Sequence, residues 1–245
     1  ALLNEASKKD IEVGFNFRKK EYHIRERIIK NEIYLTEENL IKIINTDVSH
    51  SKELTNAKNY IIISSFTGLR IGDMVYLYKL EPEYQIHEEE KYFCFTTLIR
   101  KSPENKEELL VTIPILKPVK ELLLQNGNQF PKFTSKTNIR KCIKKLLRHL
   151  EFNNYINEKK YYYLIDKAVE EKVKLNDIYS PHDCRSTYIT NLKNIGILDA
   201  DIEPITHPKH KYTSIIQVYD KNPLVVKAVN LINLLKQKKS KLYKY

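Results

Sequence analysis

The sequence predicts a mainly helical α+β domain with one small antiparallel β-sheet. Across most of the chain, apolar residues recur at helical spacing behind residues that cap helices well. Residues 92–99 and 109–113 differ, because they are rich in aromatic and β-branched residues and flank a turn-rich stretch. With 245 residues, 42% of them hydrophobic, the chain is long enough to bury a core. These observations place paired strands inside an otherwise helical chain.

The first thirty residues are predicted to lie outside the compact domain. Residues 1–10 have helical character, Gly14 interrupts it, and residues 15–31 are strongly charged. This pattern predicts the end of a helix and then a linker that either lies on DNA or is solvated. Thr36 predicts the first helix of the domain, since its side chain can cap and acidic residues follow in the first turn.

A second helix over residues 54–66 is expected to lead into the segment Thr67-Gly68-Leu69-Arg70, and a short third helix follows. The two β-rich segments predict a hairpin around residues 100–106, with a further strand near residues 83–87. Pro114 ends the second strand of the hairpin.

The rest of the chain is predicted to be helical. Residues 134–150 place Ile and Leu on one side and Lys and Arg on the other, which is typical of a basic amphipathic helix. Residues 161–173 are expected to form another helix. Ser180-Pro181 opens the next one, with serine at the N-cap and proline at the first helical position. Further helices are predicted over residues 117–125 and 225–235.

The chain is strongly basic, with 42 Lys and Arg against 31 Asp and Glu and a net charge of +11. Such an excess suits a polyanionic partner, although a lysine-rich solvated surface would give the same balance. The three cysteines lie far apart without metal-ligand spacing, which fits a reducing cytosol. No apolar run could span a bilayer and no signal peptide is visible. We therefore expect a cytoplasmic protein without a membrane partner, and the start at Ala1 suggests that an upstream part is missing.

Three segments carry residues suited to phosphodiester chemistry: Thr67-Gly68-Leu69-Arg70, Ser180-Pro181-His182-Asp183-Cys184-Arg185, and Thr206-His207-Pro208 followed by Tyr219. Arginine forks bind phosphate oxygens, histidines transfer protons, and a tyrosine can attack phosphorus. His182 and Arg185, three residues apart, share one face at a helix N-terminus, where free N–H groups favour anions. The plainer interpretation is a surface histidine and an arginine in a local salt bridge with Asp183.

In this order the segments resemble the tyrosine recombinases, the phage-integrase type of site-specific DNA recombinase. The match runs from about residue 35 to residue 235 and implies the helical catalytic domain of that family with its small antiparallel sheet. In the family, the arginine that corresponds to Arg70 grips the scissile phosphate, and Asp73 matches a supporting acid. Lys101 stands where the family carries the lysine that protonates the leaving 5′ oxygen. Asp73 could otherwise be an ordinary helix-surface acid, and Lys101 an exposed lysine at a hairpin tip.

The second histidine departs from the family pattern, which has Gly-His and a tyrosine closer behind it. His207 follows Thr206 and lies twelve residues before Tyr219, whereas His210 lies nine before it. The position of His207 after a short predicted helix favours it, and His210 remains the alternative. Tyr219 is the predicted nucleophile because of its place between this segment and the last helix, with Tyr212 as its nearest rival.

The resemblance implies that the tyrosine forms a 3′-phosphotyrosyl link, releases a 5′ hydroxyl and needs no cofactor. It also implies double-stranded DNA as the partner, on which the protein assembles as a homo-oligomer, from dimer to tetramer. The family further implies a bacterial protein that associates with the nucleoid and serves a mobile element. Residues 1–32 correspond to the end of a core-binding domain and a linker, and residues 33–222 to the catalytic domain. Residues 223–245 correspond to a C-terminal helix and basic tail that dock in their own domain or are exchanged between subunits.

Three other functions compete with recombination. A type IB topoisomerase shares the chemistry but uses no partner strand, and the Thr-Gly-Leu-Arg segment and compact size favour the recombinase. A catalytically inactive DNA-binding protein would not need the intact set of candidate residues. A basic RNA-binding module would bind nucleic acid without forming a covalent link.

Overall fold

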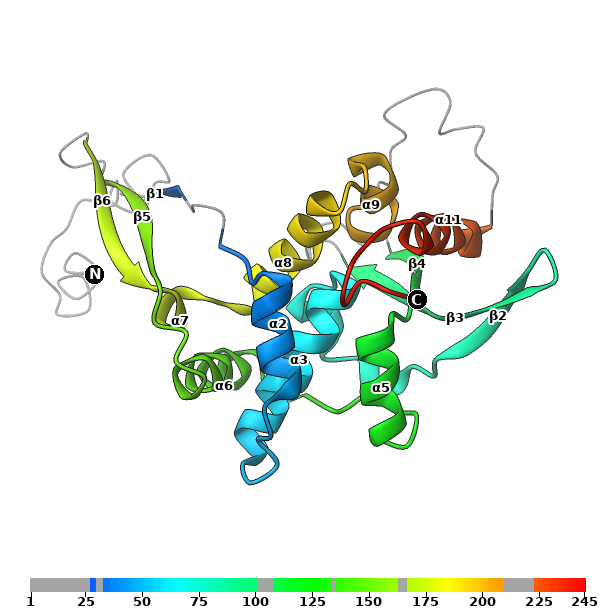
Figure 1. Ribbon diagram of the computed structural model, residues 1–245, viewed down its shortest axis with the longest axis horizontal. Helices are drawn as coiled ribbons and strands as arrows, with labels where there is room; N and C mark the ends of the chain where they lie inside the picture. The colour runs from blue at the N-terminus through cyan, green and yellow to red at the C-terminus, as the bar shows by residue number, and fades with distance from the viewer. Residues whose placement is uncertain (1–26, 30–32, 101–107, 134, 163–166, 209–222) are drawn as a thin grey trace, which may run out of the picture. The chain divides into compact units, whose positions relative to one another are not determined.

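The computed structural model describes residues 27–29, 33–100, 108–133, 135–162, 167–208 and 223–245, and the chain divides into two compact units (Figure 1). The larger unit comprises Glu32–Asn154 and Lys174–Tyr245, and the smaller one Ala1–Asn31 and Tyr155–Val173. Within the described residues the larger unit is mainly helical and holds one three-stranded antiparallel sheet. The predicted α+β class is confirmed.

The helices of the larger unit begin where the local sequence caps them. The Thr36 hydroxyl accepts a hydrogen bond from the Asn39 N–H at 3.3 Å, and Ser51 caps the following helix in the same way. None of the helices in the described ranges has the length and apolar character that a bilayer crossing needs. The helices are α2 (Glu37–Asn45), α3 (Lys52–Thr67), α4 (Ile71–Met74), the 3₁₀ helix η3 (Leu77–Lys79), α5 (Lys117–Gln125), α6 (Lys136–His149), α7 (Leu175–Ile178), α8 (Pro181–Asn194), α9 (Asp199–Thr206) and α11 (Leu224–Lys236).

Helix α3 is the centre of this unit, because it packs against α6, α8, α5 and α2. Its buried side chains include Ile61, Ile63 and Phe66, none of which is exposed to solvent. Helix α6 turns its apolar stripe inward and keeps its Lys and Arg residues on the opposite side, as the sequence predicted. The core therefore forms around α3.

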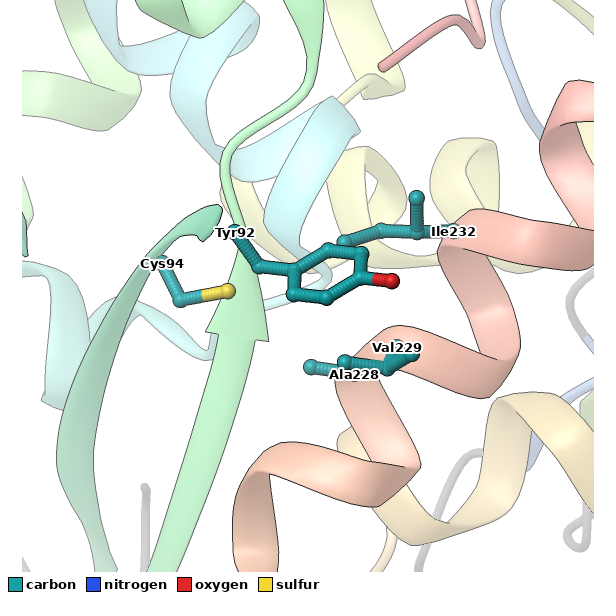
Figure 2. Close-up of a cluster of buried hydrophobic side chains, with 5 residues drawn as sticks. All are labelled: Tyr92, Cys94, Ala228, Val229 and Ile232. Atoms are coloured by element: carbon teal, nitrogen blue, oxygen red, sulfur yellow. The ribbon is translucent and has the colours of Figure 1, made fainter. Parts of the chain in front are cut away.

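The sheet has the order β2-β3-β4, with β2 (Glu83–His87), β3 (Glu90–Arg100) and β4 (Glu108–Pro114). The predicted hairpin and third strand are confirmed, and the β3–β4 register runs from Cys94↔Pro114 to Arg100↔Glu108. Helix α11 packs on β4 and β2 of this sheet. Figure 2 shows the apolar contact in which Tyr92 and Cys94 of β3 meet Ala228, Val229 and Ile232 of α11.

The residues after α11 pack into the unit instead of forming a free basic tail. Tyr243 is fully buried, and its hydroxyl donates to the Ser65 carbonyl at 3.0 Å and accepts from the Asn191 amide at 3.2 Å. The Glu37 carboxylate accepts from the Ser240 hydroxyl at 2.6 Å. The C-terminal segment thus joins the first helix of the unit to its centre.

The smaller unit corrects one prediction. Residues 161–173 were expected to be helical, but β5 (Tyr155–Tyr162) and β6 (Lys167–Lys174) form strands, in a sheet of order β1-β5-β6. Strand β1 (Arg27–Ile29) pairs antiparallel with β5 in the register Arg27↔Tyr161 to Ile29↔Lys159. The local sequence mixes Lys and Glu with Tyr and Val, which is not a β-rich run, and β5 pairs with the distant β1 on one edge and with the neighbouring β6 on the other.

Candidate active site

The Thr67-Gly68-Leu69-Arg70 segment is the junction between α3 and α4. Gly68 ends α3 in the left-handed conformation, with φ +66°. A side chain there would collide, since an added Cβ would lie 2.6 Å from Cδ1 of Tyr188 and 3.0 Å from Cγ2 of Thr206. Arg70 is the half-buried N-cap residue of α4, in extended conformation. The glycine therefore allows α8 and α9 to approach the backbone from which Arg70 projects.

The Ser180–Arg185 segment forms the start of α8, as predicted. Ser180 donates to the Asp183 carboxylate from both its N–H and its hydroxyl, each at 2.7 Å, and Pro181 occupies the first turn. His182 is exposed in this turn, whereas Arg185 is only 3% exposed. Arg185 is therefore part of the buried interior and not of the exposed face of α8.

The buried Arg185 guanidinium links all three segments. Its Nη1 donates to the Gly68 carbonyl at 2.6 Å, and its Nη2 donates to the Thr206 carbonyl. Burial and, after it, the positive charge of Arg70 lower the pKa of Arg185 to about 10, against the opposing effect of Asp73. A guanidinium with this pKa still carries its charge at neutral pH.

Helix α9 places His207 beside this arginine. His207 is the C-cap residue, and its N–H donates to the Glu203 carbonyl at 2.7 Å. Its Nδ1 lies 3.0 Å from the Thr206 hydroxyl oxygen. Partial loss of hydration lowers the pKa of His207, as do the charges of Arg185, Arg70 and His182, in that order and against the opposing effect of Glu203. The ring is therefore predominantly neutral at pH 7.

Four of the predicted residues thus meet in one place: Arg70, His182, Arg185 and His207. Asp73 lies next to them, because its N–H donates to the Arg70 carbonyl at 2.9 Å and its charge acts on Arg185. It is 5% exposed, so it is not an ordinary surface acid.

Three other predicted residues, Lys101, His210 and Tyr219, lie outside the described residues, as does Tyr212. Lys101 directly follows Arg100, the last β3 residue paired with β4.

Sequence reasoning missed two residues of this site. Tyr188 lies fully buried under Gly68, one helical turn after Arg185 on α8, and that spacing was the available signal. Thr206 is 1% exposed and contacts Gly68, Arg185 and His207. Its signal was the threonine that stands where the resembled family has glycine. Within the described ranges, no group of three or more His, Cys, Asp or Glu residues could hold a metal ion.

No protein-family model matches the chain, and no curated protein matches it either. Among solved structures, the chain is similar to residues 82–397 of the integrase of transposon Tn1549 in complex with circular intermediate DNA. The identity is 16%, the similarity covers 93% of this chain and 73% of the other, and the TM-score is 0.44.

Proposed function

We propose that this chain is the catalytic part of a site-specific DNA recombinase that cleaves and rejoins DNA through a 3′-phosphotyrosyl intermediate. One observation carries the proposal: Arg185 binds the carbonyls of Gly68 and Thr206 and so gathers three segments that are far apart in sequence. Two arginines and two histidines then share one small region. When a nucleophile attacks a phosphodiester, extra negative charge develops on the phosphate oxygens, and donors gathered in this way stabilise that transition state.

The two arginines are suited to different tasks in this site. Within the described part of the chain, the Arg70 side chain has no hydrogen-bond acceptor, so its whole fork can bind phosphate oxygens. Arg185 uses two of the five N–H donors of a guanidinium on carbonyls, which leaves donors for a phosphate. We therefore assign both arginines to binding the phosphate. Arg185 has the additional task of linking the Gly68 and Thr206 carbonyls.

In the proposed reaction, the phosphoryl group moves from the DNA 5′ oxygen to the protein and then back to a DNA 5′ oxygen. The Tyr219 oxygen bonds to phosphorus as the bond to the 5′ oxygen breaks, the phenolic proton passes to neutral His207, and Lys101 protonates the leaving oxygen. His182 is a second proton donor or acceptor beside the phosphate, and Asp73 supports Arg185. A 5′ hydroxyl then attacks the phosphotyrosine and reverses the step. His210 is the alternative proton acceptor.

Covalent trapping tests the reaction without a known target sequence. The chain is incubated with a pool of duplexes that each carry a randomised core and one nick, so that the short 5′-hydroxyl fragment diffuses away after cleavage. We expect an adduct that resists denaturation in the wild type and in Tyr212→Phe, and none in Tyr219→Phe. Sequencing the captured DNA identifies the target. DNA binding without an adduct under any condition would leave a non-catalytic module, and rapid relaxation of supercoiled plasmid without strand exchange would indicate a topoisomerase.

A modified leaving group separates Lys101 from its neighbours. A 5′-bridging sulfur leaves without being protonated, so we expect it to restore cleavage in Lys101→Ala but not in Arg70→Ala. Arg100→Ala and Lys106→Ala serve as matched controls that cleave the normal substrate. If one of these two required the sulfur instead, that residue would be the acid.

We further propose that α11 is exchanged between copies that assemble on DNA. In the single chain it covers Tyr92 and Cys94 (Figure 2), so an exchanged helix would need a vacated surface on its neighbour. Val229→Cys places a second thiol in the apolar cluster that contains buried Cys94. Oxidation should give an intramolecular disulfide in the free protein and cross-linked chains on captured DNA. An intramolecular disulfide alone in both states would contradict exchange, and the wild type with its buried Cys142 and Cys184 is the control.

A further inference from the structure

Thr206 holds its hydroxyl in one orientation. The Oγ1 atom lies 2.9 Å from the Ile202 carbonyl one turn earlier in α9, to which it donates its only hydrogen. Its carbonyl accepts from Arg185, and its Cγ2 methyl stands over Gly68. With the residue 1% exposed, backbone and side chain are both fixed.

The same oxygen is a hydrogen-bond partner of His207, with Oγ1 3.0 Å from Nδ1. Because the hydroxyl hydrogen points to Ile202, the oxygen can offer only a lone pair to the ring, and Nδ1 must supply the hydrogen. In a neutral imidazole one nitrogen carries hydrogen and the other accepts, so this contact leaves Nε2 as the acceptor.

We infer that Thr206 is a positioning residue that holds His207 in the Nδ1–H tautomer and so directs the proton-accepting Nε2 away from α9. The catalytic meaning of this inference rests on the proposed recombinase function, whereas the tautomer does not. Among the described residues, the charged groups that act on the ring are Arg185 and His182 of α8, Arg70 before α4 and Glu203 of α9. Apart from Glu203, these groups are cationic or become so on protonation, and they keep the ring neutral. Because only one nitrogen of a neutral ring can accept a proton, the tautomer decides which nitrogen that is.

The test reads the tautomer directly. Histidine ring nitrogens are labelled in the full chain, and long-range proton–nitrogen correlation spectra are recorded at pH 8 without DNA; His207→Gln identifies the ring among the seven histidines. We expect the Nδ1–H pattern in the wild type and in Thr206→Ser, which retains the hydroxyl. Thr206→Val keeps the shape and removes the hydroxyl, and should shift the ring toward Nε2–H.

Thr46→Val is the matched control, because Thr46 also lies at the end of a helix. Its hydroxyl donates to the Lys42 carbonyl, four residues earlier, at 2.7 Å, and the residue that follows it is Asp47 and not a histidine. Cleavage by Thr206→Val should fall about tenfold, the size of one lost hydrogen bond, while Thr206→Ser and Thr46→Val stay near the wild type. An unchanged His207 pattern in Thr206→Val would overturn the inference whatever the activity. If the wild type forms no covalent adduct, the recombinase proposal fails, and the spectra still decide the tautomer.

Discussion

The Arg185 guanidinium donates to the main-chain carbonyl of Gly68 at 2.6 Å, across 117 residues of sequence. Its second terminal nitrogen binds the carbonyl of Thr206, 21 residues later. Both acceptors are backbone atoms at helix ends, where carbonyls have no partner inside the helix. A buried charge is tolerated here because these carbonyls satisfy it. Stability of the unit and construction of the site therefore depend on the same side chain.

Arg70 and Arg185 should respond differently to removal. Arg185→Ala leaves two buried carbonyls unsatisfied, so we expect it to lower the free energy of unfolding by about 3 kcal/mol and to abolish cleavage. Arg70→Ala should also abolish cleavage but change stability by less than about 0.5 kcal/mol, since among the described residues its side chain has no hydrogen-bond partner. Many other Lys and Arg residues remain, so DNA binding by Arg70→Ala should persist.

Urea unfolding and adduct formation measure the two effects side by side. Arg148→Ala, which breaks an exposed ion pair with Asp177, is the control for loss of an arginine and should cost less than about 1 kcal/mol. A loss of stability in Arg70→Ala equal to that in Arg185→Ala would refute the division of tasks.

Gly68→Ala should be much more costly than the same change at Gly127. Both glycines have positive φ, +66° and +64°, so both variants incur the left-handed strain of about 1 kcal/mol. At Gly68 the new methyl would also press on the buried Tyr188 ring, whereas nothing lies within 4 Å of it at Gly127. We expect about 3 kcal/mol for Gly68→Ala and about 1 kcal/mol for Gly127→Ala in thermal or urea unfolding. Equal costs would show that packing of α8 and α9 on this glycine is unimportant.

Much of the larger unit could be predicted because its signals are local. Thr36 and Ser180-Pro181 place helix starts through bonds that span three residues, and the hairpin follows from β-rich runs with a turn between them. The strands β5 and β6 could not, because their sequence mixes Lys and Glu with Tyr and Val instead of forming a β-rich run, and β5 also pairs with residues 27–29 from far away in the chain.

The site was predictable in its motifs but not in its connections. Arg185 could be recognised from the residues around it, yet its acceptors are carbonyls, which every residue possesses and no sequence pattern marks. Tyr243 illustrates the same limit, since nothing distinguishes it among 17 tyrosines until its partners, Ser65 and Asn191, come together. Long-range contacts to backbone atoms are set by the whole fold.

Tyr243 should anchor the C-terminal segment. It is fully buried, with its ring centre 4.8 Å from that of Phe66 and 6.3 Å from that of Tyr188. Tyr243→Ala is expected to cost about 4 kcal/mol through the cavity it leaves. Tyr243→Phe should cost about 1 kcal/mol, because the Ser65 and Asn191 groups lose their partner.

Urea unfolding provides the measurement, with Tyr84→Ala as control because that ring is 57% exposed and should cost less than about 1 kcal/mol. Equal stability of Tyr243→Ala and Tyr84→Ala would mean that the segment is not anchored there. Cleavage by Tyr243→Ala is then measured without urea, at a temperature at which the variant stays folded. Loss of cleavage there would show that the substitution disturbs the site through Tyr188, which contacts both Tyr243 and Gly68.

The proton affinity of His207 should be set by the charges around it. Partial burial and the positive Arg185 and Arg70 lower its pKa, so its titration midpoint in the free protein should lie below the ordinary value of 6.5. Glu203 acts in the opposite direction, since a carboxylate stabilises the protonated ring. Glu203→Gln should therefore move the midpoint further down, and the ring then takes up its proton only at a still lower pH.

Nitrogen and proton shifts of the labelled ring give the midpoint, and Asp201→Asn, on the same helix, is the control for loss of a carboxylate. An upward shift in Glu203→Gln would show that the carboxylate does not act on the ring. Because a general base must be unprotonated to work, the acidic limb of the cleavage profile should move to lower pH in Glu203→Gln and stay in place in Asp201→Asn.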